Sequence, residues 1–349
     1  MPGKGVVLFS ETPCKSGCVC KSHIPGLECV ANRPIAHHVL DALVAAGADE
    51  LVIAGAADVL IDVRACLSGY RSESLRLDYA VSDDGADQIG VFRAAAQQVG
   101  AAPCIVHAGE GLLDHPIAPY LESLQRRSLD LVLLYQAPPS ARGPYGSGRE
   151  DEGVLTIPSI VWDAGIGVFG PGAFRDACQR DPGAGAWGLG MLAQRLSEEG
   201  ERSEVCVADG WRSYRGDPQE LLELNRLALD LLAPQVRHAS DQQNQIEGRV
   251  HIDRTASVTT SVIVGPVVIG EGAEVTNAYI GPYTSVGAGA RIEGAEIERS
   301  IISPGARVMH VGARLVCSLV GRGAHVFRDF SLPRAMRLQI GEGDQVAVC

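Results

Sequence analysis

The feature that most constrains this chain is a short aliphatic repeat in its last third. Branched aliphatic residues, often followed by glycine, recur at steps of five or six residues from Val264 to Val308, and the series resumes at Val320 and Val326. This spacing matches neither the period of about 2.0 of a strand nor that of about 3.6 of a helix. It is typical of a coil with one aliphatic on each of its faces.

We therefore predict a parallel β-helix with three faces per turn, with aliphatics inside and glycine or small residues at the corners. A run of ordinary hairpins is the alternative, and it would not keep the period over so many steps. The predicted inward positions are Val264, Ile269, Val275, Ile280, Val286, Ile292, Ile297, Ile302, Val308, Val320 and Val326.

The first 230 or so residues instead alternate short apolar runs with amphipathic stretches. The runs have the length and composition of buried strands and are Gly5–Phe9, Leu51–Gly55, Leu77–Val81, Cys104–His107, Leu129–Tyr135 and Ile166–Phe169. The predicted helices are Pro34–Ala46, Ile89–Val99, Pro116–Arg126, Gly188–Glu199 and Pro218–Leu232. This alternation favours an α/β fold with a mostly parallel sheet, whose ligands lie at the carboxyl ends of the strands.

The two patterns divide the chain. We expect an α/β domain over residues 1–232, a linker over 233–248, and a β-helix domain with a C-terminal tail over 249–349. The polar stretch Arg237–Gln245 supports the linker.

Charge and cysteine content limit the partners and the location. The chain has 30 Lys and Arg against 42 Asp and Glu, a net charge of −12, which disfavours nucleic acid or an anionic membrane as the main partner. We expect no secretory segment, because the N-terminal apolar run Val6–Phe9 is too short, and no spanning helix, because the apolar stretch Val154–Phe174 contains Pro158 and Asp163. We expect a cytoplasmic protein whose ten cysteines are mostly reduced.

Several stretches resemble a known family. Val30–Pro34 resembles a V-A-N-K-P motif, Gly165–Phe169 a G-V-Y strand and Leu221–Arg226 an L-E-x-N-R motif, and Leu332–Arg334 matches the family's tail. These motifs occur in the sugar-1-phosphate nucleotidyltransferases, in particular the long thymidylyltransferase type. The resemblance covers nearly the whole chain and implies a Rossmann-like domain followed by a left-handed β-helix.

The positions that would bind the triphosphate differ from the family's pattern. The family's first strand leads into G-G-x-G-T-R, whereas Ser10–Lys15 reads S-E-T-P-C-K. Glu11 places negative charge there and Pro13 removes a backbone donor. Lys15 falls at the arginine position, which makes it the candidate catalytic cation, while Pro25 replaces a family lysine. The resemblance places Leu8, Ser10, Gln88 and Gly109 at the nucleotide-binding positions.

The carboxylates and the sugar-phosphate cation are also altered. Glu110 aligns with the family's metal-binding aspartate, so it is the candidate ligand for Mg²⁺ if the chain is active. Tyr214 aligns with the second such aspartate, for which Asp209 or Asp217 could substitute. The family's sugar-phosphate lysine has no equivalent, because no lysine follows Lys21.

Three interpretations remain open. The first is a non-catalytic homologue in a nucleotide-sugar or secondary-metabolite pathway, acting as a regulator or scaffold with an active paralogue. The alternative is an active nucleotidyltransferase of altered specificity that joins a nucleoside triphosphate to a sugar- or cyclitol-phosphate and releases pyrophosphate. The third is a sensor of a nucleotide or sugar phosphate. In each, we expect a homo-oligomer formed through outward β-helix residues Val262, Val267, Tyr279 and Tyr283.

Cysteine and histidine clusters leave further alternatives. Cys14, Cys18, Cys20 and Cys29 lie near His23 with spacings that fit no regular zinc motif, so reduced thiols in a surface loop compete with a bound metal or a redox role. His107, beside Gly109 and Glu110, is a ligand contact or a partly buried histidine.

Overall fold

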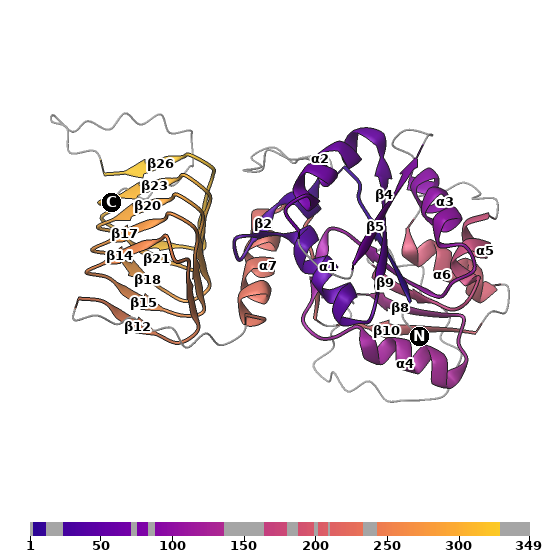
Figure 1. The fold of residues 1–349 in the computed structure, drawn as a ribbon. Helices are drawn as coiled ribbons and strands as arrows, with labels where there is room; N and C mark the ends of the chain where they lie inside the picture. The colour runs from indigo at the N-terminus through magenta and orange to yellow at the C-terminus, as the bar shows by residue number, and fades with distance from the viewer. Residues whose placement is uncertain are drawn as a thin grey trace, which may run out of the picture.

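The computed structural model describes residues 3–11, 24–70, 75–82, 88–135, 164–179, 188–198, 202–208, 210–232 and 243–328. They form an α/β body and a coiled stack of short strands, with helix α7 (Pro218–Asp230) between them (Figure 1). None of the helices in this described part is long and apolar enough to span a membrane.

The α/β body is built on a seven-stranded sheet with the order β10-β8-β9-β6-β1-β4-β5. Only β9 runs antiparallel to its neighbours, so the sheet is mostly parallel as predicted. All six predicted strands form to within one or two residues, and β10 is an addition. The strands are β1 (Lys4–Leu8), β4 (Glu50–Ala56), β5 (Arg76–Ser82), β6 (Cys104–Ala108), β8 (Leu131–Tyr135), β9 (Ala164–Phe169) and β10 (Ser203–Val207).

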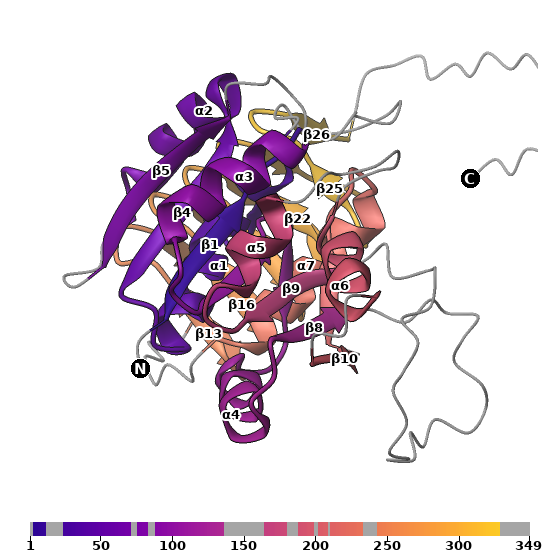
Figure 2. The same cartoon turned by 90° about the vertical axis from the view of Figure 1, so that its right-hand side faces the viewer.

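Helices cover both faces of this sheet, as an α/β layered fold requires. Helices α3, α5 and α6 pack on the face that points away from the β-helix, and α1, α2, α4 and α7 pack on the other (Figure 2). The five predicted helices are confirmed, whereas α2 and α5 were not predicted. The helices besides α7 are α1 (Ile35–Ala45), α2 (Ala57–Leu67), α3 (Gln88–Val99), α4 (Ala118–Arg127), α5 (Ala173–Gln179) and α6 (Leu189–Glu198).

Short elements complete this body at the edge that carries the candidate site. A 3-10 turn η1 (Pro25–Leu27) leads into the paired strands β2 (Cys29–Val30) and β3 (Arg33–Pro34). Strand β7 (Gly111–Leu113) pairs with β11 (Trp211–Ser213), which joins two segments far apart in sequence.

The predicted left-handed parallel β-helix is confirmed in the last third of the chain. Three five-stranded parallel sheets form its faces, with the orders β12-β15-β18-β21-β24, β13-β16-β19-β22-β25 and β14-β17-β20-β23-β26. The strands are β12 (Gln245–Glu247), β13 (Val250–Ile252), β14 (Ser257–Thr259), β15 (Val262–Val264), β16 (Val267–Ile269), β17 (Glu274–Thr276), β18 (Tyr279–Ile280), β19 (Thr284–Val286), β20 (Arg291–Glu293), β21 (Glu296–Glu298), β22 (Ile301–Ile302), β23 (Arg307–Met309), β24 (Leu315–Val316), β25 (Leu319–Val320) and β26 (His325–Phe327).

Nine of the eleven predicted inward positions are buried, and two differ. Val264 is half-buried, because its neighbour Ile263 points inward and stacks on Ile280 of the next coil. Val326 lies half-buried in the last described coil. Strand β12 falls inside the segment expected as linker, so the coils begin a few residues before 249.

Two of the four residues expected on an outer oligomerisation face point elsewhere. Val267 is fully buried in the β-helix interior, because it lies on the same side of β16 as Ile269. Tyr283 packs against the core of the α/β body. Val262 and Tyr279 remain half-buried on the face formed by β15 and β18.

A buried asparagine in α7 joins the two bodies. Asn225 has no exposed surface, and its Oδ1 accepts hydrogen bonds from the backbone N–H of Ala31 at 2.8 Å and from the hydroxyl of Ser285 at 2.6 Å. Its Nδ2 donates to the carbonyl oxygen of Tyr283 at 3.1 Å. One side chain therefore connects α7, the turn after β2 and a coil of the β-helix.

The side chain of Asn32, in the turn after β2, makes a second hydrogen bond between the two bodies. Asn32 donates from Nδ2 to the carbonyl oxygen of Val286 in β19 at 2.6 Å. Ala31 and Asn32 both have positive φ angles, 47° and 61°, a backbone region that asparagine tolerates better than most residues. Both asparagines belong to motifs that carry the family resemblance, so those motifs form the domain interface.

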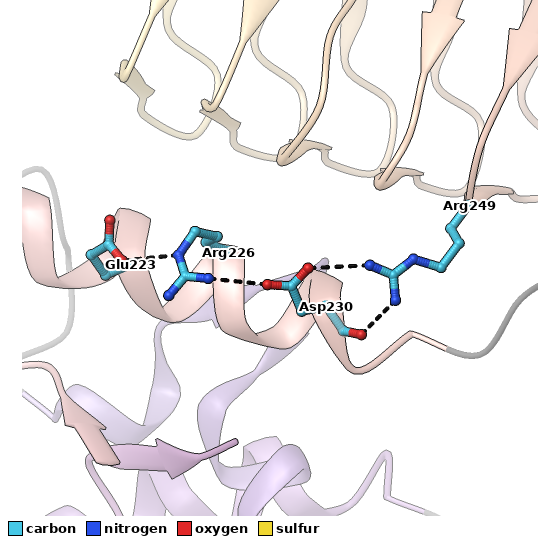
Figure 3. Close-up of polar contacts among 4 residues, drawn as sticks. All are labelled: Glu223, Arg226, Asp230 and Arg249. Atoms are coloured by element: carbon cyan, nitrogen blue, oxygen red, sulfur yellow. Dashed lines mark hydrogen bonds and ion pairs between the residues drawn. The ribbon is translucent and has the colours of Figure 1, made fainter. Parts of the chain in front are cut away.

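An ion-pair chain fixes the end of α7 against the first coils (Figure 3). Arg249 donates to the backbone carbonyl of Asp230 at 2.6 Å and to its carboxylate at 3.1 Å, and Arg226 bridges Asp230 and Glu223 at 3.0 Å each. These side chains are about one third exposed, so each pair contributes at most about 1 kcal/mol. These ion pairs orient α7 more than they stabilise the fold.

Candidate functional site

The candidate nucleotide-binding positions gather where β1 and β6 end side by side. The amide of Gly109 donates to the carbonyl oxygen of Leu8 at 2.8 Å, and Ser10 follows half-buried. A Cβ at Gly109 would lie 2.9 Å from that oxygen and from the ring of Phe9. Close packing of the two strand ends therefore explains this glycine without a ligand.

Three residues of the sequence-predicted site lie partly or wholly beyond what the structure describes. Lys15 and Pro13 fall outside the described residues, and Gln88 is described only by its backbone, as the first residue of α3. Their roles stay predictions.

The structure places the backbones of Glu110 and Tyr214, which align with the family's two metal-binding aspartates, side by side. The amide of Tyr214 donates to the carbonyl oxygen of Glu110 at 2.8 Å, just beyond the β7–β11 pair. The Tyr214 side chain is only 4% exposed and packs in the apolar core, so it supplies no second carboxylate.

An arginine that sequence reasoning did not single out lies beside Glu110. The Nε of Arg215 is 3.8 Å from Oε1 of Glu110, and the Arg215 amide donates to Glu220 at 2.7 Å. The Glu110 carboxylate therefore faces a guanidinium of the chain itself. The sequence signal that could have pointed to Arg215 is its position directly after Tyr214, which replaces the family's aspartate.

Asp209 and Asp217, the proposed substitutes for the second metal-binding carboxylate, do not form a metal site with Glu110 among the described residues. Asp217 caps α7, with Oδ1 accepting from the amide of Gln219 at 2.8 Å, and Asp209 lies outside the described residues. Among the residues that the structure describes, no three His, Cys, Asp or Glu side chains gather in a way that could hold a metal.

His107 lies beneath the site as a packing residue. It is 1% exposed, its Nδ1 lies 2.6 Å from the carbonyl oxygen of Ala108, and its ring meets Trp211 edge-on at 5.3 Å. Trp211 in turn requires small neighbours, since a Cβ at Gly165 or Gly111 would overlap its ring. The geometry corresponds to the buried-histidine interpretation.

The described part of the cysteine cluster is a neutral thiol. Burial raises the pKa of Cys29 to about 11, with nearby Glu28 adding to the effect, so the thiol is protonated at neutral pH. Metal binding and redox reactions need the thiolate. Cys14, Cys18, Cys20 and His23 lie outside the described residues.

Buried histidines predict a loss of stability in mild acid. Burial lowers the pKa of His107 and of His38 to about 4, against 6.5 for an exposed imidazole. As pH falls from 6.5 towards 4, the unfolded chain takes up protons that the folded chain does not. Stability is therefore full above pH 6.5 and falls by up to about 3 kcal/mol per histidine by pH 4.

Denaturant unfolding between pH 4 and 7 measures this loss. We expect His107→Asn to flatten the dependence of stability on pH relative to the wild type. Equal slopes in the His107 variant and the wild type would contradict the assignment.

Curated relatives match almost the entire chain. A low-salt glycan biosynthesis nucleotidyltransferase, Agl11 of Haloferax volcanii, is 26% identical over 98% of this chain and 99% of its own length. Glucose-1-phosphate thymidylyltransferases of Streptomyces antibioticus and Streptomyces griseus are 26% and 25% identical, covering 92% and 99% of this chain and 93% and 99% of their own lengths. No protein-family model matches the sequence.

A solved structure supports the fold. A Bacillus anthracis protein named as a glucose-1-phosphate thymidylyltransferase, crystallised with sucrose, superposes with a TM-score of 0.52 at 18% identity. The superposition covers 66% of this chain and 97% of the Bacillus anthracis chain. The curated relatives confirm the resemblance seen in the sequence, since the chain is similar to sugar-1-phosphate nucleotidyltransferases over nearly its whole length, and the solved structure confirms the fold.

Proposed function

We propose that this protein is a non-catalytic nucleotidyltransferase homologue that acts as a regulator or scaffold in a nucleotide-sugar or secondary-metabolite pathway. The observation that carries the proposal is the Arg215 guanidinium 3.8 Å from Glu110, beside a buried Tyr214 where the family has a second carboxylate. Phosphoryl transfer depends on Mg²⁺ and on cations that neutralise the phosphates. A guanidinium beside the remaining carboxylate disfavours a metal there.

The residues that hold the two bodies together support the same proposal. Asn32 and Asn225 of the family motifs form hydrogen bonds across the interface, while the positions of the phosphate loop and of one carboxylate are replaced. A chain that keeps the architecture and loses the reactive groups is suited to binding and assembly. An active paralogue is the partner we favour, and the free thiols of the described cysteines support a cytoplasmic location.

The alternative is an active enzyme of altered specificity, and Glu110 favours it. This carboxylate lies at the strand end where ligands bind in α/β sheets and is a suitable Mg²⁺ ligand if substrate phosphates complete the shell.

The dependence of ligand binding on Mg²⁺ separates the two functions. We expect dTTP, glucose-1-phosphate or dTDP-glucose to raise the melting temperature equally with Mg²⁺ and with a chelator, because the Arg215 guanidinium lies beside the Glu110 carboxylate. A shift that requires Mg²⁺ and disappears in Glu110→Ala would favour the enzyme.

Self-association through the β-helix is a further expectation. Val262 and Tyr279 lie half-buried on one flat face, where the Arg314 guanidinium stacks on the Tyr279 ring at 4.8 Å. We expect light scattering to give a homo-oligomer at micromolar concentration, and a Val262→Asp/Tyr279→Asp double variant to shift it towards monomer. A monomeric wild type would contradict this expectation.

A further inference from the structure

A cavity of about 560 Å³ lies between the α/β body and the β-helix. One wall comes from η1, β2 and the start of α7, and includes Leu27, Tyr214 and Leu221. The other wall is the β-helix corner that follows β16, β19, β22 and β25, with Ile301 and Leu319 beside it. The volume falls in the range of small-ligand pockets, about 300–1,000 Å³.

Coil stacking explains why this corner is hollow. A Cβ at Gly270 would lie 2.9 Å from the amide nitrogen of Ala288, and one at Gly287 would lie 2.6 Å from the nitrogen of Pro304. The corner must therefore carry small residues, and α7 passes it without filling the space. Because Asn225 and Asn32 fix the spacing of the two bodies by hydrogen bonds, the cavity is preformed.

Charge decides which ligand suits the cavity. Three charged residues line it, the acidic Glu28 and Glu271 and the basic Arg322. Two negative groups against one positive group disfavour a nucleoside triphosphate and favour a ligand that carries an ammonium group. The walls of Tyr214 and the leucines suit the faces of a ring, and Ser303 can hydrogen-bond a hydroxyl group.

We propose that this cavity binds a small hydroxylated ring amine of the amino-sugar class, at a site separate from the candidate nucleotide positions. Leu8, Ser10, Gly109 and Glu110 do not line it, whereas Tyr214, whose amide donates to Glu110, lies in its wall. The proposal goes beyond the proposed function and does not depend on it, because the site can be occupied whether or not the chain is an enzyme.

Calorimetric titration of the full-length chain with two matched sugars tests the ligand class. Glucosamine at neutral pH should bind saturably, and glucose, which lacks only the amine, at least about tenfold more weakly. Glucose-1-phosphate, which adds negative charge, should not displace glucosamine. No saturable binding of glucosamine up to about 10 mM, or equal binding of glucose, would overturn the proposal.

Variants at exposed positions locate the site without threatening the fold. Glu271→Gln should weaken glucosamine binding about tenfold, whereas Arg322→Gln should not weaken it, since the guanidinium repels an ammonium. Ala288→Phe should fill the cavity and abolish binding, with Ala288→Ser as its matched control. Wild-type binding in both Glu271→Gln and Ala288→Phe, with unchanged melting of the free proteins, would place the ligand elsewhere and refute the proposal.

Discussion

Full-length protein incubated with glucose-1-phosphate, Mg²⁺ and any common nucleoside triphosphate should release no detectable pyrophosphate. Removal of one preorganised donor in such a site costs about 10²–10³ in rate. Here Glu11 and Pro13 stand in the triphosphate loop, Tyr214 replaces a carboxylate and Arg215 lies on Glu110. Two such losses together lower a turnover of about 1–10³ per second by about 10⁴–10⁶, and the remaining replacements lower it again, so we expect no measurable release.

Two variants sharpen that assay. Glu110→Ala should leave the baseline unchanged, and Arg215→Ala should also stay inactive, because Tyr214 and the altered loop remain. Ordinary turnover in the wild type that Glu110→Ala abolishes would establish the altered-specificity enzyme instead.

The β-helix could be predicted from the sequence because its period is a property of neighbouring residues. The period could not decide which of the adjacent aliphatics Ile263 and Val264 points inward, and stacking on Ile280 decides for Ile263. Alternation within a strand would have placed Val267 inside, because it lies two residues from the buried Ile269. Helix α5, with seven residues, is too short to show a clear helical period.

The candidate site was predicted less completely, because its decisive contacts join distant segments. Alignment assigned positions 110 and 214 to the family's two metal-binding aspartates, and the β7–β11 pair places their backbones together. It did not predict that Tyr214 turns into the core or that Arg215 faces Glu110, since both depend on the packing of that pair. The role of Asn225 was likewise invisible, because its partners lie at positions 31, 283 and 285.

Replacement of Asn225 by alanine should produce the largest loss of stability of any single polar substitution in the interface. It removes three hydrogen bonds and leaves the amide of Ala31, the hydroxyl of Ser285 and the carbonyl of Tyr283 without this partner. Each unsatisfied buried group costs about 1–3 kcal/mol, so we expect a loss of at least about 3 kcal/mol in the free energy of unfolding. Urea denaturation followed by circular dichroism measures it.

Graded controls separate the connecting role of Asn225 from a general helix effect. Ser285→Ala removes one of the three bonds and leaves the others, so it should cost about 1 kcal/mol. Gln219→Ala, at an exposed position of the same helix, should stay within about 0.5 kcal/mol of the wild type. Because Asn225 joins the two bodies, its alanine variant should also unfold in two separate transitions. A single transition with a loss no larger than that of Ser285→Ala would show that the interface does not depend on this side chain.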